Sequence, residues 1–195
     1  MSFRQSITGV ILAGGRGSRM GGQDKGLVPL LSKPLYQYIL ARLSPQVGQV
    51  IINANRNQAR YRESQLTVIS DLNSDFSGPL AGMQAALHYA KTEWLLFVPC
   101  DVPDFPLNLA KKMFSEKGTH LACYAQDNER EHPTFALLHN SLKTRLDDYL
   151  ARGDRKLMLF MREIDAKGII FTSESDTFIN LNTPEDSRLW ERQRK

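Results

Sequence analysis

The stretch LAGGRGSRMGGQDKG, from Leu12 to Gly26, combines six glycines with three basic side chains, Arg16, Arg19 and Lys25. Glycine has no Cβ, so its backbone N–H groups can approach an anion closely, and the basic side chains add fixed positive charge. The pattern favours a loop that binds phosphate, with a solvated surface loop as the alternative. The open question is whether such a loop only holds an anion or also takes part in chemistry on it.

Two common phosphate-binding motifs do not fit this loop. A P-loop requires G-x-x-x-x-G-K-[ST], but Gln23 follows Gly22 where the motif needs lysine. A dinucleotide fingerprint requires G-x-G-x-x-G, but Met20 stands where the third glycine should be. The sequence therefore gives little support to a kinase-like P-loop or to an NAD site.

Polar side chains also stand at the ends of predicted strands. Asn53 and Asn55 end the run QVIINAN, Asp71 ends LTVISD, and Asp101 ends the very apolar run EWLLFVPCD. In open α/β sheets, ligands bind beyond the carboxyl ends of the strands, so the fold would bring these side chains and the glycine loop to one edge.

The two aspartates have both a functional and a structural interpretation. A carboxylate at a strand end beside a triphosphate could hold Mg²⁺, which takes one or two carboxylates together with phosphate oxygens. Asp101 fits this role, and Asp71 could do the same or accept hydrogen bonds from a base or ribose. The structural alternative for Asp101 is a turn or helix cap, because Pro103 and Pro106 follow it.

The second half of the chain contains a further group of basic and amide side chains. In the run INLN, Asn180 and Asn182 alternate along a predicted strand, so both would point to one face. They could belong to a second anionic pocket, or they could precede a helix capped by Thr183 while the basic residues form a solvated helix face. The basic residues are Arg152, Arg155, Lys156 and Arg162.

Strand-like runs alternate with helical patterns along the whole chain. The apolar runs predict strands at 7–13, 49–55, 66–71, 93–101, 120–126, 132–139, 167–172 and 178–182. Helical spacing predicts helices at 34–43, 78–90, 141–153, 155–164 and from Pro184 onward. This order indicates a single α/β domain over residues 1–195, with a mostly parallel central sheet and helices on both faces.

Composition limits the classes of function. With 195 residues, 42% of them hydrophobic, and a net charge of +4, the chain can bury a substantial core. It has no basic stripe with interleaved aromatics that would indicate nucleic-acid binding, and no apolar run long enough for a membrane span. Cys100 and Cys123 have no CxxC spacing, so we expect neither a disulfide scaffold nor a zinc site, and a cytoplasmic protein.

Taken together, the motifs resemble the molybdenum cofactor guanylyltransferase (MobA) family. In order along the chain they are LAGG, R-x-x-R-M-G-G-x-D-K-G, NAN, an aspartate at 71, GPLAGM, PCDxP, ER-x-HPT and NLNTPE. LAGG with R-M-G and lysine marks only the wider class of nucleotidyltransferases, whereas NAN, GPLAGM and NLNTPE are more specific. The resemblance implies a Rossmann-like nucleotidyltransferase fold of the glycosyltransferase-A type. It also implies transfer of GMP from GTP to molybdopterin, with Mg²⁺ and release of pyrophosphate.

The resemblance also implies roles for individual residues. A GTP-binding part, about 1–105, would contact the nucleotide through Leu12, Ala13, Gly14, Gly15, Lys25, Asn53, Asp71 and Asp101. Molybdopterin would be bound by the part at about 106–195 together with the glycine loop, through Arg19, Arg155, Lys156, Asn180 and Asn182. Asp101 would hold Mg²⁺, and Asp101, Lys25 and Arg19 would act in catalysis.

Alternatives remain at this point. A related nucleotidyltransferase could use CTP or a sugar phosphate, because sequence physics alone does not derive the base preference. A non-catalytic nucleotide-binding adaptor would lack the loop lysine or the strand-end carboxylate, whereas this chain has both Lys25 and Asp101. Beyond the two substrates, the resemblance suggests molybdenum-insertion proteins and molybdoenzyme chaperones as partners.

Overall fold

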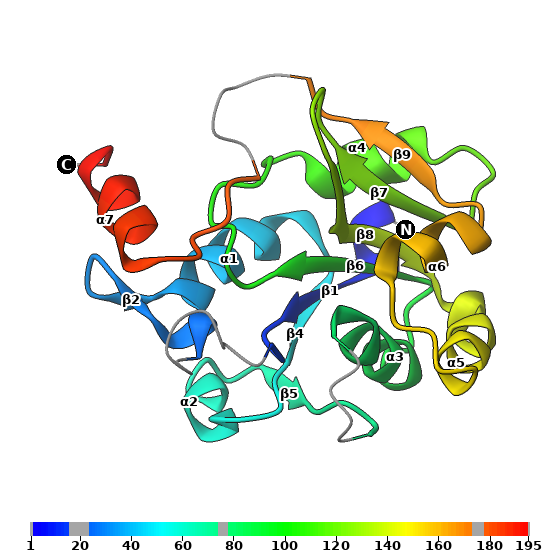
Figure 1. Ribbon diagram of the computed structural model, residues 1–195, viewed down its shortest axis with the longest axis horizontal. Helices are drawn as coiled ribbons and strands as arrows, with labels where there is room; N and C mark the ends of the chain where they lie inside the picture. The colour runs from blue at the N-terminus through cyan, green and yellow to red at the C-terminus, as the bar shows by residue number, and fades with distance from the viewer. Residues whose placement is uncertain (1, 16–23, 74–77, 173–177, 195) are drawn as a thin grey trace.

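A seven-stranded sheet runs through the centre of the computed structural model, which describes residues 2–15, 24–73, 78–172 and 178–194 (Figure 1). Its first strand in sequence, β1, lies inside the sheet rather than at an edge. In spatial order the strands are β5 (Thr67–Ile69), β4 (Gln49–Asn53), β1 (Ile7–Leu12), β6 (Trp94–Pro99), β8 (Glu131–His139), β7 (Ala122–Gln126) and β9 (Lys167–Ile170).

Most neighbouring strands in this sheet are parallel. β1 pairs in parallel with β4 and β6, β4 with β5, and β7 with β9, whereas β8 runs antiparallel between β6 and β7. In register, Leu12 of β1 lies opposite Asn53 of β4 and Pro99 of β6. The carboxyl ends of these three strands therefore meet at one edge, which confirms the predicted mostly parallel sheet.

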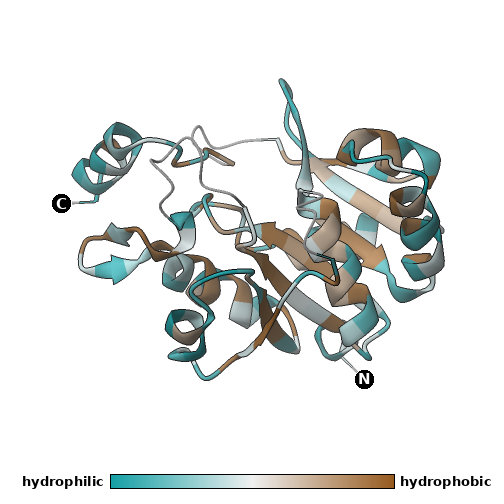
Figure 2. Cartoon of the chain, turned by 60° about the horizontal axis from the view of Figure 1, so that its bottom comes forward, coloured by the Kyte–Doolittle hydropathy of each residue, from teal (hydrophilic) through white to brown (hydrophobic). Residues whose placement is uncertain are grey.

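Helices cover both faces of the sheet because consecutive strand residues point to opposite sides. Ile11 and Leu96 join one buried cluster with α1, α2 and α4, whereas Val10 and Leu95 join a second with α3, α5 and α6. Figure 2 shows the apolar strands surrounded by helices that carry hydrophilic residues. The helices are α1 (Leu35–Leu43), α2 (Gln58–Arg62), α4 (Leu109–Glu116), α3 (Pro79–Tyr89), α5 (Lys143–Ala151) and α6 (Leu157–Glu163).

The C-terminal helix α7 (Pro184–Arg192) packs beside a two-stranded hairpin of β2 (Pro29–Leu30) and β3 (Lys33–Pro34) (Figure 1). Trp190 is buried in a small cluster with Leu30, Leu35 and Leu181, and its Nε1 donates a 2.6 Å hydrogen bond to Asp104. This contact fixes a segment from the end of the chain against the N-terminal half.

The start of α7 is built as the sequence predicts. Thr183 accepts a hydrogen bond from Asp186 N, and the Asp186 side chain accepts one from Thr183 N, which is a capping box with Pro184 in the first turn. Burial acts to raise the pKa of Asp186, but hydrogen bonds from the Thr183 side chain and from the backbone N–H groups of Thr183 and Asn182 hold that pKa below its usual value.

The sequence was wrong about one strand and silent about several elements. Residues 178–182 form no strand, because Phe178 has a left-handed φ of 67° and Leu181 N bonds to Asp101 O instead of a sheet neighbour. The β2–β3 hairpin, α2 and α4 are short and were not predicted. Among the described residues, four single-turn 3₁₀ helices occur, at Phe3–Ser6, Lys25–Leu27, Ser44–Gln46 and Asn140–Leu142. Within the described ranges, no helix has the length and apolar character needed to cross a bilayer.

Candidate active site

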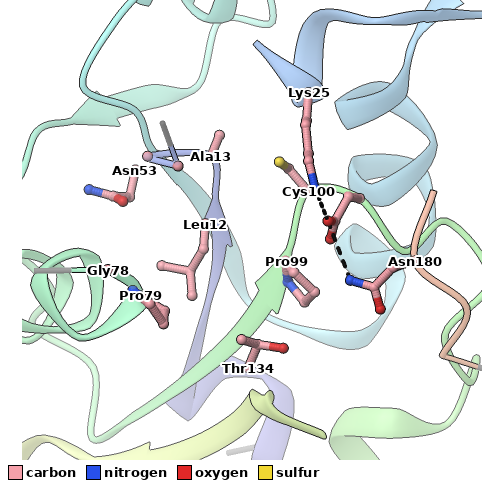
Figure 3. Close-up of a pocket in the computed structure, with 13 residues that line it drawn as sticks. Leu12, Ala13, Lys25, Asn53, Gly78, Pro79, Pro99, Cys100, Thr134 and Asn180 are labelled. Atoms are coloured by element: carbon pink, nitrogen blue, oxygen red, sulfur yellow. Dashed lines mark hydrogen bonds and ion pairs between the residues drawn. The ribbon is translucent and has the colours of Figure 1, made fainter. Parts of the chain in front are cut away.

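A cavity of about 570 Å³ opens where β1, β4 and β6 end (Figure 3). Its walls come from the ends of β1, β4 and β6, from Lys25 near the end of the glycine loop, and from the start of α3, β8 and the segment before α7. The lining residues are Leu12, Ala13, Gly14, Gly15, Lys25, Asn53, Gly78, Pro79, Pro99, Cys100, Asp101, Thr134 and Asn180.

Lys25 and Asp101 form an ion pair on one side of this cavity. Lys25 Nζ lies 3.1 Å from Asp101 Oδ2 and donates a 2.7 Å hydrogen bond to Asn182 Oδ1. Asn180 Nδ2 donates to the same Asp101 oxygen at 3.3 Å, and Figure 3 shows Lys25 and Asn180 reaching one carboxylate from opposite sides. The two charged side chains are 22% and 12% exposed, so water screens them less than an open surface pair.

The backbone around Asp101 and Asn182 explains why these side chains meet. Asp101 lies two residues after the end of β6, whose six residues are all buried in the middle of the sheet, so the strand fixes where this side chain starts. Leu181 N donates to Asp101 O at 2.8 Å, which places Asn180 and Asn182 on either side of that contact. The Asp186 carboxylate accepts from Asn182 N at 2.9 Å, so the helix cap also holds the Asn182 backbone.

A network of amides and one carboxylate forms the opposite wall. Asn53 Nδ2 and Asn55 Nδ2 donate to the two oxygens of Asp71, each at 2.8 Å, and Asn55 Oδ1 accepts from Asp71 N. Asn53 lines the cavity and is 2% exposed, whereas Asp71 lies behind it. Gly82 of α3 is needed for this packing, because a Cβ there would lie 2.3 Å from Asn53 Oδ1.

The N-terminus of α3 faces the cavity between these two walls. Gly78 precedes the helix with φ +66°, a left-handed conformation that side chains rarely adopt, and Gly78 and Pro79 both line the cavity. The first N–H groups of a helix lack partners within the helix and carry partial positive charge. Together with Lys25, this end of α3 makes the cavity suitable for an anion.

A divalent cation at Asp101 would need oxygen ligands from a bound substrate in addition to this one carboxylate. Within the described residues, no group of three or more His, Cys, Asp and Glu is placed to hold a metal ion. The hydrogen bonds from described residues to the Asp101 carboxylate use Oδ2, which leaves Oδ1 for a further ligand. One carboxylate beside an anion-binding cavity matches the way Mg²⁺ is held by a protein together with substrate phosphates.

Of the basic residues predicted for the second substrate, the two that the structure describes, Arg155 and Lys156, do not line this cavity. Arg155 lines a separate cavity of about 170 Å³ between α3 and α5, and its guanidinium donates to Leu150 O and Asp154 O. Lys156 is exposed where α6 begins. Arg19 lies outside the described residues. The predicted molybdopterin contacts of these three residues therefore stay predictions, whereas Asn180 and Asn182 do reach the main site.

Several lining residues were not predicted from the sequence. Thr134 contributes a side chain from β8, and Cys100 lies beside the Asp101 carboxylate. Burial, reinforced by the nearby Asp101 and Asp24, raises the pKa of the Cys100 thiol well above its usual value. A signal existed for both, because PCD and HPT are among the motifs that carried the resemblance.

A family model described as the MobA-like NTP transferase domain matches residues 9–167. A molybdenum cofactor guanylyltransferase from Yersinia pestis (strain Pestoides F) is 59% identical over 193 residues, with 99% of each chain covered. The protein of that name from Yersinia pseudotuberculosis serotype O:3 (strain YPIII) matches with the same identity and coverage.

Solved structures show the same fold. A molybdopterin-guanine dinucleotide biosynthesis protein A from Archaeoglobus fulgidus superimposes with a TM-score of 0.75 at 23% identity, covering 95% of this chain and 97% of that one. A CMP:2-keto-3-deoxy-manno-octonic acid synthetase complexed with CTP gives 0.76 at 13% identity, covering 97% and 99%. Because the family model covers most of the chain and the Yersinia relatives match nearly all of it, the chain belongs to the molybdenum cofactor guanylyltransferase family of nucleotidyltransferases.

Proposed function

We propose that this chain transfers GMP from GTP to molybdopterin, which yields molybdopterin guanine dinucleotide and pyrophosphate. The observation that carries this proposal is the Lys25–Asp101 pair, set at 3.1 Å in a cavity formed by three parallel strand ends. A lysine and a carboxylate beside an anion-binding cavity supply the charge that nucleotidyl transfer needs.

The shape of the cavity suggests how GTP lies in it. The backbone of Leu12 to Gly15 and the Asn53 side chain form one end, and Lys25 with Asp101 forms the other. We place the nucleoside at the Asn53 end, where Asp71 acts by holding Asn53, and the phosphates toward Lys25. The N-terminus of α3 lies beside this path and adds N–H donors for the phosphate oxygens.

In the reaction, an oxygen of the molybdopterin phosphate forms a bond to the α-phosphorus of GTP. The bond from that phosphorus to the oxygen bridging to the β-phosphorus breaks, and its electron pair leaves with pyrophosphate. The acceptor phosphate is already an anion, so no side-chain nucleophile is required. Lys25 neutralises charge that develops on the leaving pyrophosphate, and the protein otherwise holds the two reactants in line.

Magnesium is the cation that we propose for this site, held by Asp101 together with phosphate oxygens of GTP. When bound, it supplies charge neutralisation at the phosphates and brings the reacting groups together. Lys25 would exchange its contact with Asp101 for a contact with phosphate, which frees the carboxylate for this role.

The acceptor side of the proposal rests on Asn180 and Asn182. Both belong to the segment before α7 and form hydrogen bonds with the Lys25–Asp101 pair, and Figure 3 shows Asn180 across the cavity from Asn53. We therefore propose that the part at about 106–195 presents the acceptor to a nucleotide held by the part at about 1–105. Reaction in the cytoplasm, with cofactor delivered and removed by molybdenum-insertion proteins and molybdoenzyme chaperones, is the setting we expect.

A product assay tests the function directly. The chain is mixed with GTP, Mg²⁺ and molybdopterin, and the guanine dinucleotide is measured by chromatography and mass spectrometry. Asp101→Asn keeps the size of the side chain and removes its charge, so we expect at least about a hundredfold lower kcat. Near wild-type turnover of this variant at saturating Mg²⁺ would rule out the metal-holding role of Asp101.

Choice of nucleotide is tested by thermal shift with GTP, CTP, ATP and UTP, each with Mg²⁺. At a hundredfold excess over its Kd, a ligand that binds the native state should raise the Tm by about 5–10 °C for a chain of this size. We expect the largest rise with GTP. A larger rise with CTP would instead favour the related cytidylyltransferase activity.

A further inference from the structure

Asp24 is a buried carboxylate directly before Lys25, and neither the proposed mechanism nor the cavity lining includes it. Only 8% of this residue is exposed. Tyr61 Oη donates to Asp24 Oδ1 at 2.5 Å, and Asn57 Nδ2 donates to Asp24 Oδ2 at 3.1 Å. Both carboxylate oxygens are thus fixed by side chains that lie more than 30 residues away in sequence.

The partners of Asp24 come from the chain that leaves β4. Asn57 takes a left-handed conformation, with φ 51°, and its carbonyl accepts from Arg60 N at the start of α2. This turn brings Tyr61 of α2 under the end of the glycine loop. One segment therefore holds both ends of the cavity, since Asn53 lines its nucleoside end and Tyr61 supports the residue next to Lys25.

The neighbours of Lys25 on both sides, Asp24 and Gly26, are held in place by their packing against α2. On one side, Asp24 is held as described, and its carbonyl accepts from Leu27 N at 3.0 Å. On the other side, a Cβ on Gly26 would lie 2.4 Å from Tyr61 Oη, so Gly26 packs directly on Tyr61. The long lysine side chain is flexible, so the place from which it starts decides which atoms its ammonium can reach.

The Tyr61 hydroxyl is suited to a permanent donor role. Tyr61 is fully buried, and burial, followed by the nearby Cys100 and Asp24, raises its pKa far above the usual range. The hydroxyl therefore keeps its proton at every pH at which the chain is folded. A buried carboxylate needs such donors, because water is not there to replace them.

We propose that Asp24, Tyr61 and Asn57 are positioning residues that set the Lys25 ammonium for the nucleotide phosphates. This inference rests on the proposed function of Lys25 and names what holds that lysine in place. Asp24 acts through its neighbour, because its own carboxylate is turned into the protein toward Tyr61 and Asn57.

Tyr61→Phe tests the proposal, with Tyr36→Phe as the matched control. Tyr36 is equally buried, its ring packs edge-on against Tyr61 at a centroid distance of 5.0 Å, and it takes no part in the hydrogen bonds to Asp24. By calorimetric titration we expect Tyr61→Phe to weaken GTP binding about tenfold, and Tyr36→Phe to change it less than about twofold. A Tyr61→Phe protein that has a lower Tm but binds GTP like wild type would overturn the proposal.

Dependence on Lys25 separates positioning from a general loss of structure. In a Lys25→Ala background the phosphate contact is gone, so Tyr61→Phe should cause no further loss of GTP affinity. An equal tenfold loss with and without Lys25 would mean that Tyr61 acts by another route. If wild-type protein itself binds no GTP, the proposed function fails, whereas normal wild-type binding with an unaffected Tyr61→Phe variant refutes only this inference.

A charge exchange provides a second, independent check. Asp24→Asn removes the acceptor for one of the two donors, and Asn57→Asp would place a second carboxylate beside the first. The double variant Asp24→Asn, Asn57→Asp again pairs one carboxylate with one amide, so we expect it to bind GTP at least about threefold more tightly than either single variant. Binding by the double variant no better than by the weaker single variant would contradict the proposed network.

Discussion

Gly82→Ala measures how closely α3 packs on the Asn53 end of the cavity, where we propose that the nucleoside binds. Within a helix, alanine is normally better than glycine by about 1 kcal/mol. Here a Cβ would lie 2.3 Å from Asn53 Oδ1 and 2.9 Å from Leu12 Cδ2. Carbon and oxygen atoms do not pack that closely, so Asn53 must turn away, and α3 must also move outward to relieve the contact with Leu12.

The cost of these movements can be worked out from the contacts. Turning Asn53 breaks its 2.8 Å hydrogen bond to the Asp71 carboxylate. A hydrogen bond to a charged group contributes about 1.5–3 kcal/mol, and overpacking costs about 1–3 kcal/mol more. Set against the helix preference for alanine, the net loss in the free energy of unfolding is about 1.5–5 kcal/mol, or a Tm lower by at least about 3 °C.

The assay is scanning calorimetry of wild type, Gly82→Ala, Asn53→Ala and the double variant. Without the Asn53 amide most of the clash is gone, so alanine at position 82 should cost at least about 1 kcal/mol less in that background. Titration with GTP on the same four proteins should show Gly82→Ala weakening binding to a similar extent as Asn53→Ala. A raised Tm with unchanged GTP affinity, as helix propensity alone would give, would refute the reasoning.

Three further outcomes are expected. Lys25→Ala should weaken GTP binding about tenfold or more, and by more than Asn182→Ala, because Lys25 would contact the phosphates directly and Asn182 would not. An equal or reversed order in calorimetric titration would contradict the assignment. The hydrogen bond from His132, helped by backbone donors, lowers the pKa of Asp127 to about 2. Since the folded pKa lies below the unfolded value of 3.8, wild type should lose this stabilisation as the pH falls from about 4 to about 2, whereas Asp127→Asn should not, as acid-unfolding curves can show. Because its pKa is raised, Cys100 should react with iodoacetamide at pH 8 at least about tenfold more slowly in folded protein than in guanidinium, measured by peptide mass spectrometry.

Strand ends were the part of the site that sequence could locate. Asn53 and Asp101 each follow an apolar run, and parallel strands bring such positions to one edge, so their meeting followed from pattern and topology together. Asn180 and Asn182 also reach the site, but not because they alternate along a strand, as the sequence predicted. The hydrogen bond from Leu181 N to Asp101 O and the cap at the start of α7 hold them there.

Contacts between short, irregular segments were beyond sequence reasoning. Asp24 looked like one more loop residue, because nothing local says that Tyr61 lies beneath it. Arg155 and Lys156 belong to a basic run, and such a run is typical both of an anion-binding pocket and of a solvated helix face. In the fold these two residues lie near α5 and α6. Charge alone therefore did not place them, because position depends on helix packing at long sequence separation.

The docking of the C-terminal segment also has a consequence for the order of events in folding. The Lys25–Asn182 hydrogen bond joins residues 157 positions apart, and the Trp190–Asp104 bond joins residues 86 apart. Contacts between distant residues form slowly, because chain entropy must be lost before they contribute. We expect refolding protein to regain its far-ultraviolet circular dichroism first, and the signal of Trp190 and full GTP affinity in a slower phase. Nucleotide binding would then report on the last step of folding, since Lys25 gains its final partner only when α7 has docked.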